Sequence, residues 1–169
     1  MGKDYLVKGA KLMCVNGKGI VELDIPKEHG YDEKGRAKAN CTDCKEKDNI
    51  PYFEACMKNK DTNLCEGYMK LAKQWENTVG ISSQMEKVNG QNAITLDSVL
   101  ICNSGGLIMP FTSGQGERQN VDMSTFNQRY QKSLYWAKGK NPAFHIEKWD
   151  PINMNTGNFL YEKEDLVVP

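Results

Sequence analysis

Two segments that lie far apart in the chain share one pattern of apolar residues, cysteine and glycine. Leu12–Val21 has the pattern of an apolar strand ending at Cys14, a glycine-containing turn and a second apolar strand, and Leu100–Ile108 repeats it around Cys102. Asn, Ser and Gly between two apolar runs are typical of hairpins, because these residues tolerate the positive φ of tight turns. The sequence therefore predicts two equivalent hairpins. If they pack side by side, the thiols of Cys14 and Cys102 can meet.

The charge balance argues against nucleic-acid or membrane-surface binding. The 169 residues include 22 Lys and Arg and 22 Asp and Glu, so the formal net charge is zero and a basic footprint is missing. No stretch approaches the roughly 18 to 20 apolar residues that span a bilayer, and the N-terminal residues contain no apolar run of signal-peptide length. We expect a protein made in the cytoplasm without a signal peptide or a membrane-spanning segment. The length suits a domain of about 100 to 150 residues with an appendage.

The six cysteines favour reduced thiols or a metal site over a disulfide framework, because no signal peptide is recognised. Cys41 and Cys44 form a C-x-x-C pair, a spacing that lets two thiolates bind one zinc ion. A structural zinc site takes four ligands, so six cysteines offer more than one quartet. Disulfides and unliganded buried thiols are the alternatives. A redox function for Cys41 and Cys44 is not expected, because no βαβ pattern surrounds them.

The chain between the two hairpins contains strand, loop and helix patterns. Val21, Leu23 and Ile25 alternate with acidic residues as in a strand, whereas residues 27–49 are polar and predict a loop with a solvated, charged face. Apolar residues recur at helical spacing within Glu66–Trp75, which predicts a short inserted helix that covers the core.

A longer amphipathic helix is predicted after the second hairpin. Asp122, or Ser124 after it, can cap its N-terminus, and Gly139–Pro142 ends it. Its apolar face, widened by Trp136, consists of Met123, Phe126, Tyr130, Leu134 and Ala137. Such a face needs a partner, which would be the preceding domain, a second copy of the chain or a following domain.

Catalytic motifs are scarce. The two histidines, His29 and His145, lie in no metal or nucleophile motif, and we interpret them as a surface residue and a packing residue. A binding or structural role is therefore the better interpretation. A small thiol enzyme that uses Cys41 or Cys44 is the least favoured hypothesis.

Several segments together resemble the PAAR-like proteins of contractile injection systems, which include the type VI secretion system. The resemblance covers roughly residues 5 to 116 and is carried by Gly9–Cys14, Asn49–Cys56, Cys65, Trp75 and Leu96–Ile108. It implies a small β-rich cone that caps a trimeric VgrG-like spike and carries effectors.

The same resemblance points to Cys14, Cys56, Cys65 and Cys102 as the set that binds zinc or forms disulfides. Glu54 and Ala55 stand where such proteins usually have Gly-x before the second of these cysteines. Cys41 and Cys44 are additions to the pattern, as extra ligands or a bridge. The resemblance therefore leaves open which four thiols bind.

The C-terminal segment carries a second resemblance. Trp149–Leu166 looks like the entry motif of Rhs toxins, D-P-V-x-x-x-T-G-x-F, which precedes their YD-repeat shell. It implies that the chain is the N-terminal part of a larger toxin. Whether the chain is truncated, cleaved or complete at Pro169 is open at this point.

The predicted protein is mainly β and has three parts: a conical PAAR-like spike-tip domain at 1–116, a linker with an amphipathic helix at 117–140, and an extended Rhs-entry-like tail at 141–169. The resemblances imply a non-enzymatic function, in which the domain caps the spike and couples an Rhs shell and toxin to it for delivery, with a loading chaperone as a further partner. The protein would be cytoplasmic before firing and then secreted through the injection apparatus. The alternative is a free-standing protein-interaction module stabilised by zinc or disulfides.

Overall fold

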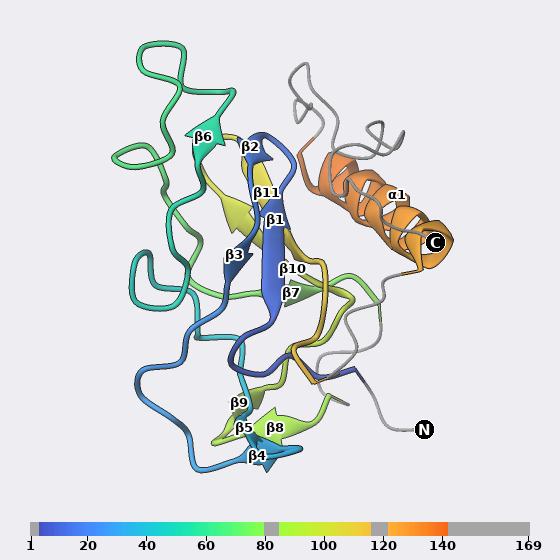
Figure 1. Ribbon diagram of the computed structural model, residues 1–169. Helices are drawn as coiled ribbons and strands as arrows, with labels where there is room; N and C mark the ends of the chain where they lie inside the picture. The colour runs from blue at the N-terminus through green and yellow to red at the C-terminus, as the bar shows by residue number, and fades with distance from the viewer. Residues whose placement is uncertain (1–3, 80–84, 116–121, 142–169) are drawn as a thin grey trace.

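The two predicted hairpins lie side by side at the centre of a mainly β fold (Figure 1), in a computed structural model that describes residues 4–79, 85–115 and 122–141. Strands β1 and β11 pair antiparallel, with Cys14 opposite Ile108, and this pairing joins the hairpins into one sheet of order β3-β1-β11-β10-β7. The two repeated patterns therefore do pack side by side, which is the condition for their thiols to meet. The strands are β1 (Lys11–Cys14), β3 (Val21–Glu22), β7 (Glu76–Asn77), β10 (Ser98–Cys102) and β11 (Gly106–Pro110).

Three two-stranded ladders accompany this sheet. Strands β2 and β6 lie near one end of the central strands, and the other two ladders lie together at the opposite end (Figure 1). The ladders pair β2 (Gly17–Lys18) with β6 (Ala55–Cys56), β4 (Asp32–Glu33) with β5 (Arg36–Ala37), and β8 (Lys87–Val88) with β9 (Gln91–Asn92).

The expectation of a solvated loop over residues 27–49 is wrong for residues 37–44. Ala37, Ala39, Cys41 and Cys44 are buried in the core. Backbone hydrogen bonds hold this stretch against distant parts of the chain, because the Ala39 N–H donates to the Leu6 carbonyl and the Cys41 N–H to the Asn92 carbonyl. The small side chains fit beneath these contacts, although the surrounding sequence is polar.

The predicted helix over Glu66–Trp75 is also wrong. The N–H groups of Tyr68 and Met69 both bond to the Cys65 carbonyl in a tight turn, and Gly67 adopts φ +84°, a left-handed conformation that ends any helix. The chain then extends beside β10, where Leu71 forms an antiparallel bridge with Cys102. The apolar residues of this segment cover the sheet without helical geometry.

The strand alternation divides the core between the two faces of the sheet. Leu12 and Cys14 of β1 belong to one buried cluster, whereas Met13 and Val15 belong to the other. This alternation follows from the two-residue period of a strand. The first cluster is covered by the loops between the hairpins.

The second cluster is covered by α1 (Met123–Lys140), which lies beside the sheet (Figure 1). The predicted helix is confirmed, including the cap, because the Asp122 carboxylate accepts the Ser124 N–H at 3.1 Å. Its partner is the preceding domain. The buried residues of the helix are Phe126, Tyr130, Ser133 and Ala137.

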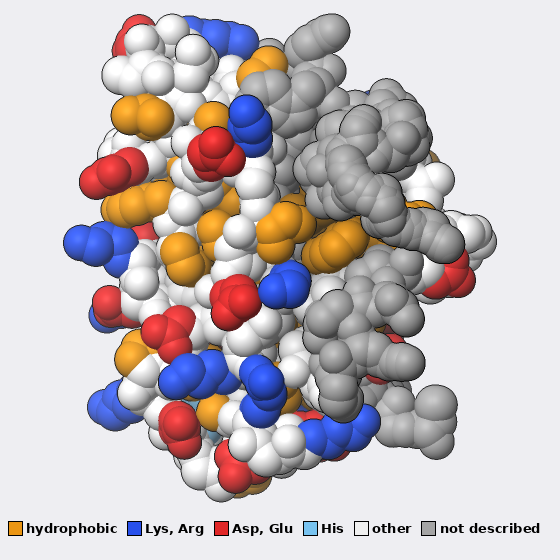
Figure 2. Space-filling model, viewed as in Figure 1, with side chains coloured by type: hydrophobic (Ala, Val, Ile, Leu, Met, Phe, Trp, Pro, Cys, Tyr) orange, Lys and Arg blue, Asp and Glu red, His pale blue; other side chains and the backbone are white. Residues whose placement is uncertain are grey.

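The surface carries both signs of charge. Figure 2 shows basic and acidic side chains interspersed over the face in view. No helix within the described ranges has the length and apolar character needed to cross a membrane. His145 and the Rhs-entry-like segment lie outside the described residues.

Candidate functional site

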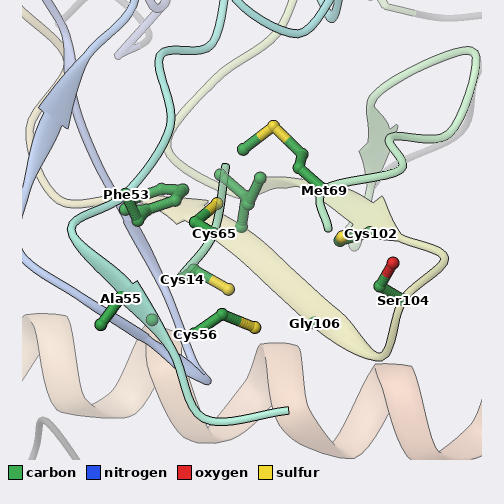
Figure 3. A pocket seen from close by; sticks show the side chains of 11 residues that line it. Cys14, Phe53, Ala55, Cys56, Cys65, Met69, Cys102, Ser104 and Gly106 are labelled. Atoms are coloured by element: carbon green, nitrogen blue, oxygen red, sulfur yellow. The ribbon is translucent and has the colours of Figure 1, made fainter. Parts of the chain in front are cut away.

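Four of the six cysteines surround one small cavity. Cys14, Cys56, Cys65 and Cys102 come from four separate segments and gather around a common space (Figure 3). The cavity has a volume of about 20 Å³, which is room for a single occupant of about the size of a water molecule. The other lining residues are Gly17, Phe53, Ala55, Met69, Ser104, Gly106 and Ile108.

The sheet places Cys14 and Cys102 at the same end of the two strands that flank β11. Cys14 ends β1 and Cys102 ends β10, and β11 lies between them. The side-chain amide of Asn16 donates a hydrogen bond to the Gly105 carbonyl at 2.9 Å. This bond joins the turns that follow the two cysteines, so the two hairpins hold their sulfur atoms in a fixed relation.

Two glycines make room for the Cys14 side chain. A Cβ atom on Gly106 would lie 2.9 Å from the Cys14 sulfur, and one on Gly17 would lie 3.0 Å from the Cys14 Cβ. Gly106 is the pairing partner of Cys102, and Gly17 is the partner of Cys56. Because these two positions have no side chain, the Cys14 side chain has room to approach Cys56 and Cys102.

Burial dominates the electrostatics of Cys14 and Cys65, the two buried thiols of the cavity. It raises the pKa of Cys14 to about 12, and the neighbouring Cys102 and Cys56 add to the rise, whereas the N–H groups of Asn16 and Leu107 oppose it. Without a metal, the Cys14 thiol therefore stays protonated at neutral pH.

The pKa of Cys65 is raised for the same reason. Burial raises its pKa to about 11, the Phe53 N–H acts in the opposite direction, and Cys56 and Cys102 contribute to the rise. Cys14 and Cys65 thus each respond to the same two cysteines. This mutual influence indicates that the four sulfur atoms belong to one electrostatic cluster.

Backbone N–H groups point at three of the four sulfur atoms. Asn16 and Leu107 donate to Cys14, Phe53 donates to Cys65, and the Lys70 N–H lies 3.4 Å from the Cys102 sulfur. Hydrogen bonds of this kind favour the thiolate, which is the form that binds metals.

The donor set fits a thiophilic ion, because four sulfur ligands are the composition of a structural zinc site. All six cysteines are free thiols in the structure. Within the described parts of the chain, no three Cys, His, Asp or Glu side chains are arranged to hold a metal ion. Metal binding would therefore require the cysteine side chains to turn further toward the shared cavity.

A comparison with known protein families shows which part of the chain forms a family domain. Residues 6–115 match the model of a family described as a domain of unknown function, DUF4280. The chain belongs to the DUF4280 family. The matched region contains the whole central sheet and all four cysteines of the cavity, and it ends before α1. No curated protein and no solved structure matches the chain.

The other two cysteines of the DUF4280 domain, Cys41 and Cys44, do not line the cavity. Burial raises the pKa of both thiols, that of Cys44 to about 11, and the nearby Asp43 carboxylate contributes to both rises. A nucleophilic cysteine needs the opposite shift. The structure therefore gives the C-x-x-C pair a place in the core, apart from the four-cysteine cavity.

His29 is not the surface residue that the sequence indicated. Its side chain is only 14% exposed, and its Nε2 lies 2.8 Å from an oxygen of the buried Asp43 carboxylate. The same carboxylate accepts the Asn40 N–H at 2.8 Å. No local motif predicts this pair, because the two residues lie 14 positions apart in a polar segment.

Proposed function

We propose that the DUF4280 domain of this chain is a non-enzymatic spike tip, which caps a trimeric VgrG-like spike of a contractile injection system and couples an Rhs-type toxin to it for delivery. One observation carries the proposal. Cys14, Cys56, Cys65 and Cys102, the four cysteines that the resemblance to PAAR-like proteins selects, line one cavity, and the two additional cysteines do not.

The physical requirements of a spike tip agree with this fold. The domain is small and many of its strands have two residues, so each pair of strands shares few hydrogen bonds and gives limited rigidity. A clamp that joins four distant segments would stiffen it against force. A domain of this size gains much from such a clamp, because its hydrophobic core is limited.

Within this proposal, the clamp is a zinc ion held by the thiolates of Cys14, Cys56, Cys65 and Cys102. A zinc ion bound by four thiolates is structural and links the segments that supply its ligands. The N–H groups of Asn16, Phe53 and Lys70 would help to hold the sulfur atoms in the charged form. Disulfides among the same four cysteines are the competing form of the clamp.

Elemental analysis should find about one zinc per chain in protein purified without added metal. Replacing Cys56 or Cys102 by serine, one at a time, should remove the zinc, because a neutral hydroxyl is a poor substitute for a thiolate. Cys41→Ser and Cys44→Ser are matched controls that should keep it. Retention of zinc in the first pair and loss in the second would assign the ion to the C-x-x-C pair. Absence of metal with fewer than six free thiols before reduction would establish disulfides instead.

Association with a spike is tested by mixing the purified chain with the trimeric VgrG-like spike protein of the same genome. We expect a complex of one chain per spike trimer in size-exclusion chromatography with light scattering. Cys102→Ser should weaken this complex if the clamp shapes the docking surface, whereas Cys44→Ser should not. A chain that elutes apart from the trimer at micromolar concentrations would count against the spike-tip function.

The second candidate is a free-standing protein-interaction module. A clamp at the four-cysteine cavity would serve it as well, because zinc or disulfides stabilise a small domain whatever its partner, but this function does not account for the Rhs-entry-like segment. The two functions differ in their expected complexes, since only a spike tip requires a threefold partner. A chain that binds zinc through these cysteines but forms no complex with the spike trimer would support the module.

A further inference from the structure

The apolar face beneath α1 belongs entirely to the DUF4280 domain, although the helix does not. The family match ends at residue 115, and the helix begins at Met123. The domain side of this cluster has almost no exposed surface while the helix is in place. It consists of Met13, Val15, Val99, Leu107 and Met109.

The helix contacts the domain near both of its ends. Near its start, the Phe126 ring packs edge-on against Phe111 with centroids 5.0 Å apart. One turn on, the Arg129 guanidinium donates to the Pro110 carbonyl at 3.0 Å. At its end, the Lys140 ammonium lies 3.2 Å from the carboxylate of Glu76 in β7. The contacts of the helix therefore reach from the end of β11 to the edge strand β7.

The contact residues of α1 form one stripe with a defined size pattern. Two aromatic residues, Phe126 and Tyr130, are followed by the small Ser133 and Ala137, and all four are buried. The stripe follows helical periodicity. Tyr135 lies away from it and is 83% exposed. The domain therefore contacts one face of the helix and selects side-chain size along it.

The helix also carries its own terminal hydrogen bonds. Asp122 caps the N-terminus through the Ser124 N–H, and the Asn141 N–H donates to the Ala137 carbonyl at the other end. Lys138 and Lys140 in the last turn complement the helix dipole. Residues 122–141 thus contain the stripe and both ends of a helical ligand.

We propose that the sheet face of Met13, Val15, Val99, Leu107 and Met109 is a docking site for an amphipathic helix, and that α1 remains bound there when its covalent link to the domain is cut. The chain beyond Lys140 would then be attached to the domain by side-chain packing as well as by the backbone. This consequence for toxin coupling rests on the proposed function, whereas the docking itself does not.

The test uses the full chain with a protease site inserted between residues 115 and 122. After cutting, we expect the two pieces to elute together in size-exclusion chromatography at micromolar concentration. Tyr130→Ala should raise the dissociation constant of the cut complex about 100-fold or more, because it empties a buried aromatic site. Tyr135→Ala makes the same chemical change on the exposed face and should alter it less than about threefold.

A synthetic peptide of residues 122–141 separates weak docking from misfolding. Added in excess to the cut Tyr130→Ala protein, the wild-type peptide should replace the variant helix and bind the domain. The proposal is overturned if the wild-type pieces separate after cutting, if both tyrosine variants weaken binding equally, or if the peptide does not bind. The cut-chain experiment does not measure spike binding. A failure of the helix to dock would therefore not contradict the spike-tip function, which is tested by mixing the chain with the spike protein.

Discussion

Replacing Trp75 by alanine is expected to lower the free energy of unfolding by about 3 to 5 kcal/mol. The indole is 3% exposed and belongs to the larger buried cluster. Its Nε1–H donates to the Asp43 carbonyl at 2.9 Å, and the Trp75 backbone N–H donates to the Cys41 carbonyl at 2.9 Å. The alanine variant would lose the packing and the side-chain hydrogen bond together. Urea denaturation of the wild-type and variant proteins measures the difference.

Two further variants show how much of the lost stability comes from the hydrogen bond and how much from the packing of the ring. Trp75→Phe keeps an aromatic ring and removes the N–H donor, so it should cost about 1 to 3 kcal/mol, because the Asp43 carbonyl loses its indole partner. Tyr31→Ala removes an aromatic residue that is 45% exposed and should change stability by less than about 1 kcal/mol. A Trp75→Ala effect no larger than that of Tyr31→Ala would show that the Trp75 ring contributes little to the core.

The hairpins and α1 are predictable because their signals are local. Turn residues between apolar runs specify a hairpin, and a capped stripe of apolar residues specifies a helix. Glu66–Trp75 carried the same kind of periodic signal and is not a helix. The periodic pattern in this segment is short. The pairing of Leu71 with Cys102 depends on a strand that follows about 30 residues later. Long-range pairing decided its conformation.

The candidate site was found by resemblance and by the repeated cysteine pattern together. Cys14 and Cys102 are marked by their hairpins, whereas Cys56 and Cys65 lie in irregular chain whose position relative to the sheet no local pattern specifies. Gly106 and Asn16 could have been noticed only as turn residues, although their role is to make space for a sulfur atom and to join two turns. Such roles depend on neighbours that are remote in sequence.

The buried polar residues of the 37–44 stretch escaped prediction for a related reason. Lys38 is 5% exposed, and its ammonium contacts the carboxylates of Glu33 and Glu86 and lies 4.0 Å from the centre of the Tyr5 ring. A lysine in a charged run is usually solvated. Here the pairing partners come from distant segments, so only the assembled fold reveals that the charge is satisfied.

The cavity and the docked helix lie on opposite faces of the same hairpins. Cys14 points to one side of β1 and Met13 to the other, so the sulfur cluster and the α1 site share a single strand. A shift of β1 along β11 by one residue would exchange the two faces. The register that gathers the cysteines therefore also creates the apolar face that α1 covers.

Phe126→Ala in the intact chain is expected to lower the free energy of unfolding by about 3 to 5 kcal/mol. The ring is 1% exposed, contacts Phe111 edge-on, and lies beneath the Arg129 guanidinium at 5.2 Å. A double-mutant cycle with Phe111→Ala should give a coupling energy of about 0.5 to 1.5 kcal/mol. If the helix were an independent appendage, Phe126→Ala would leave the denaturation midpoint of the β domain unchanged. A large, single cooperative shift would instead show that α1 and the sheet unfold as one unit.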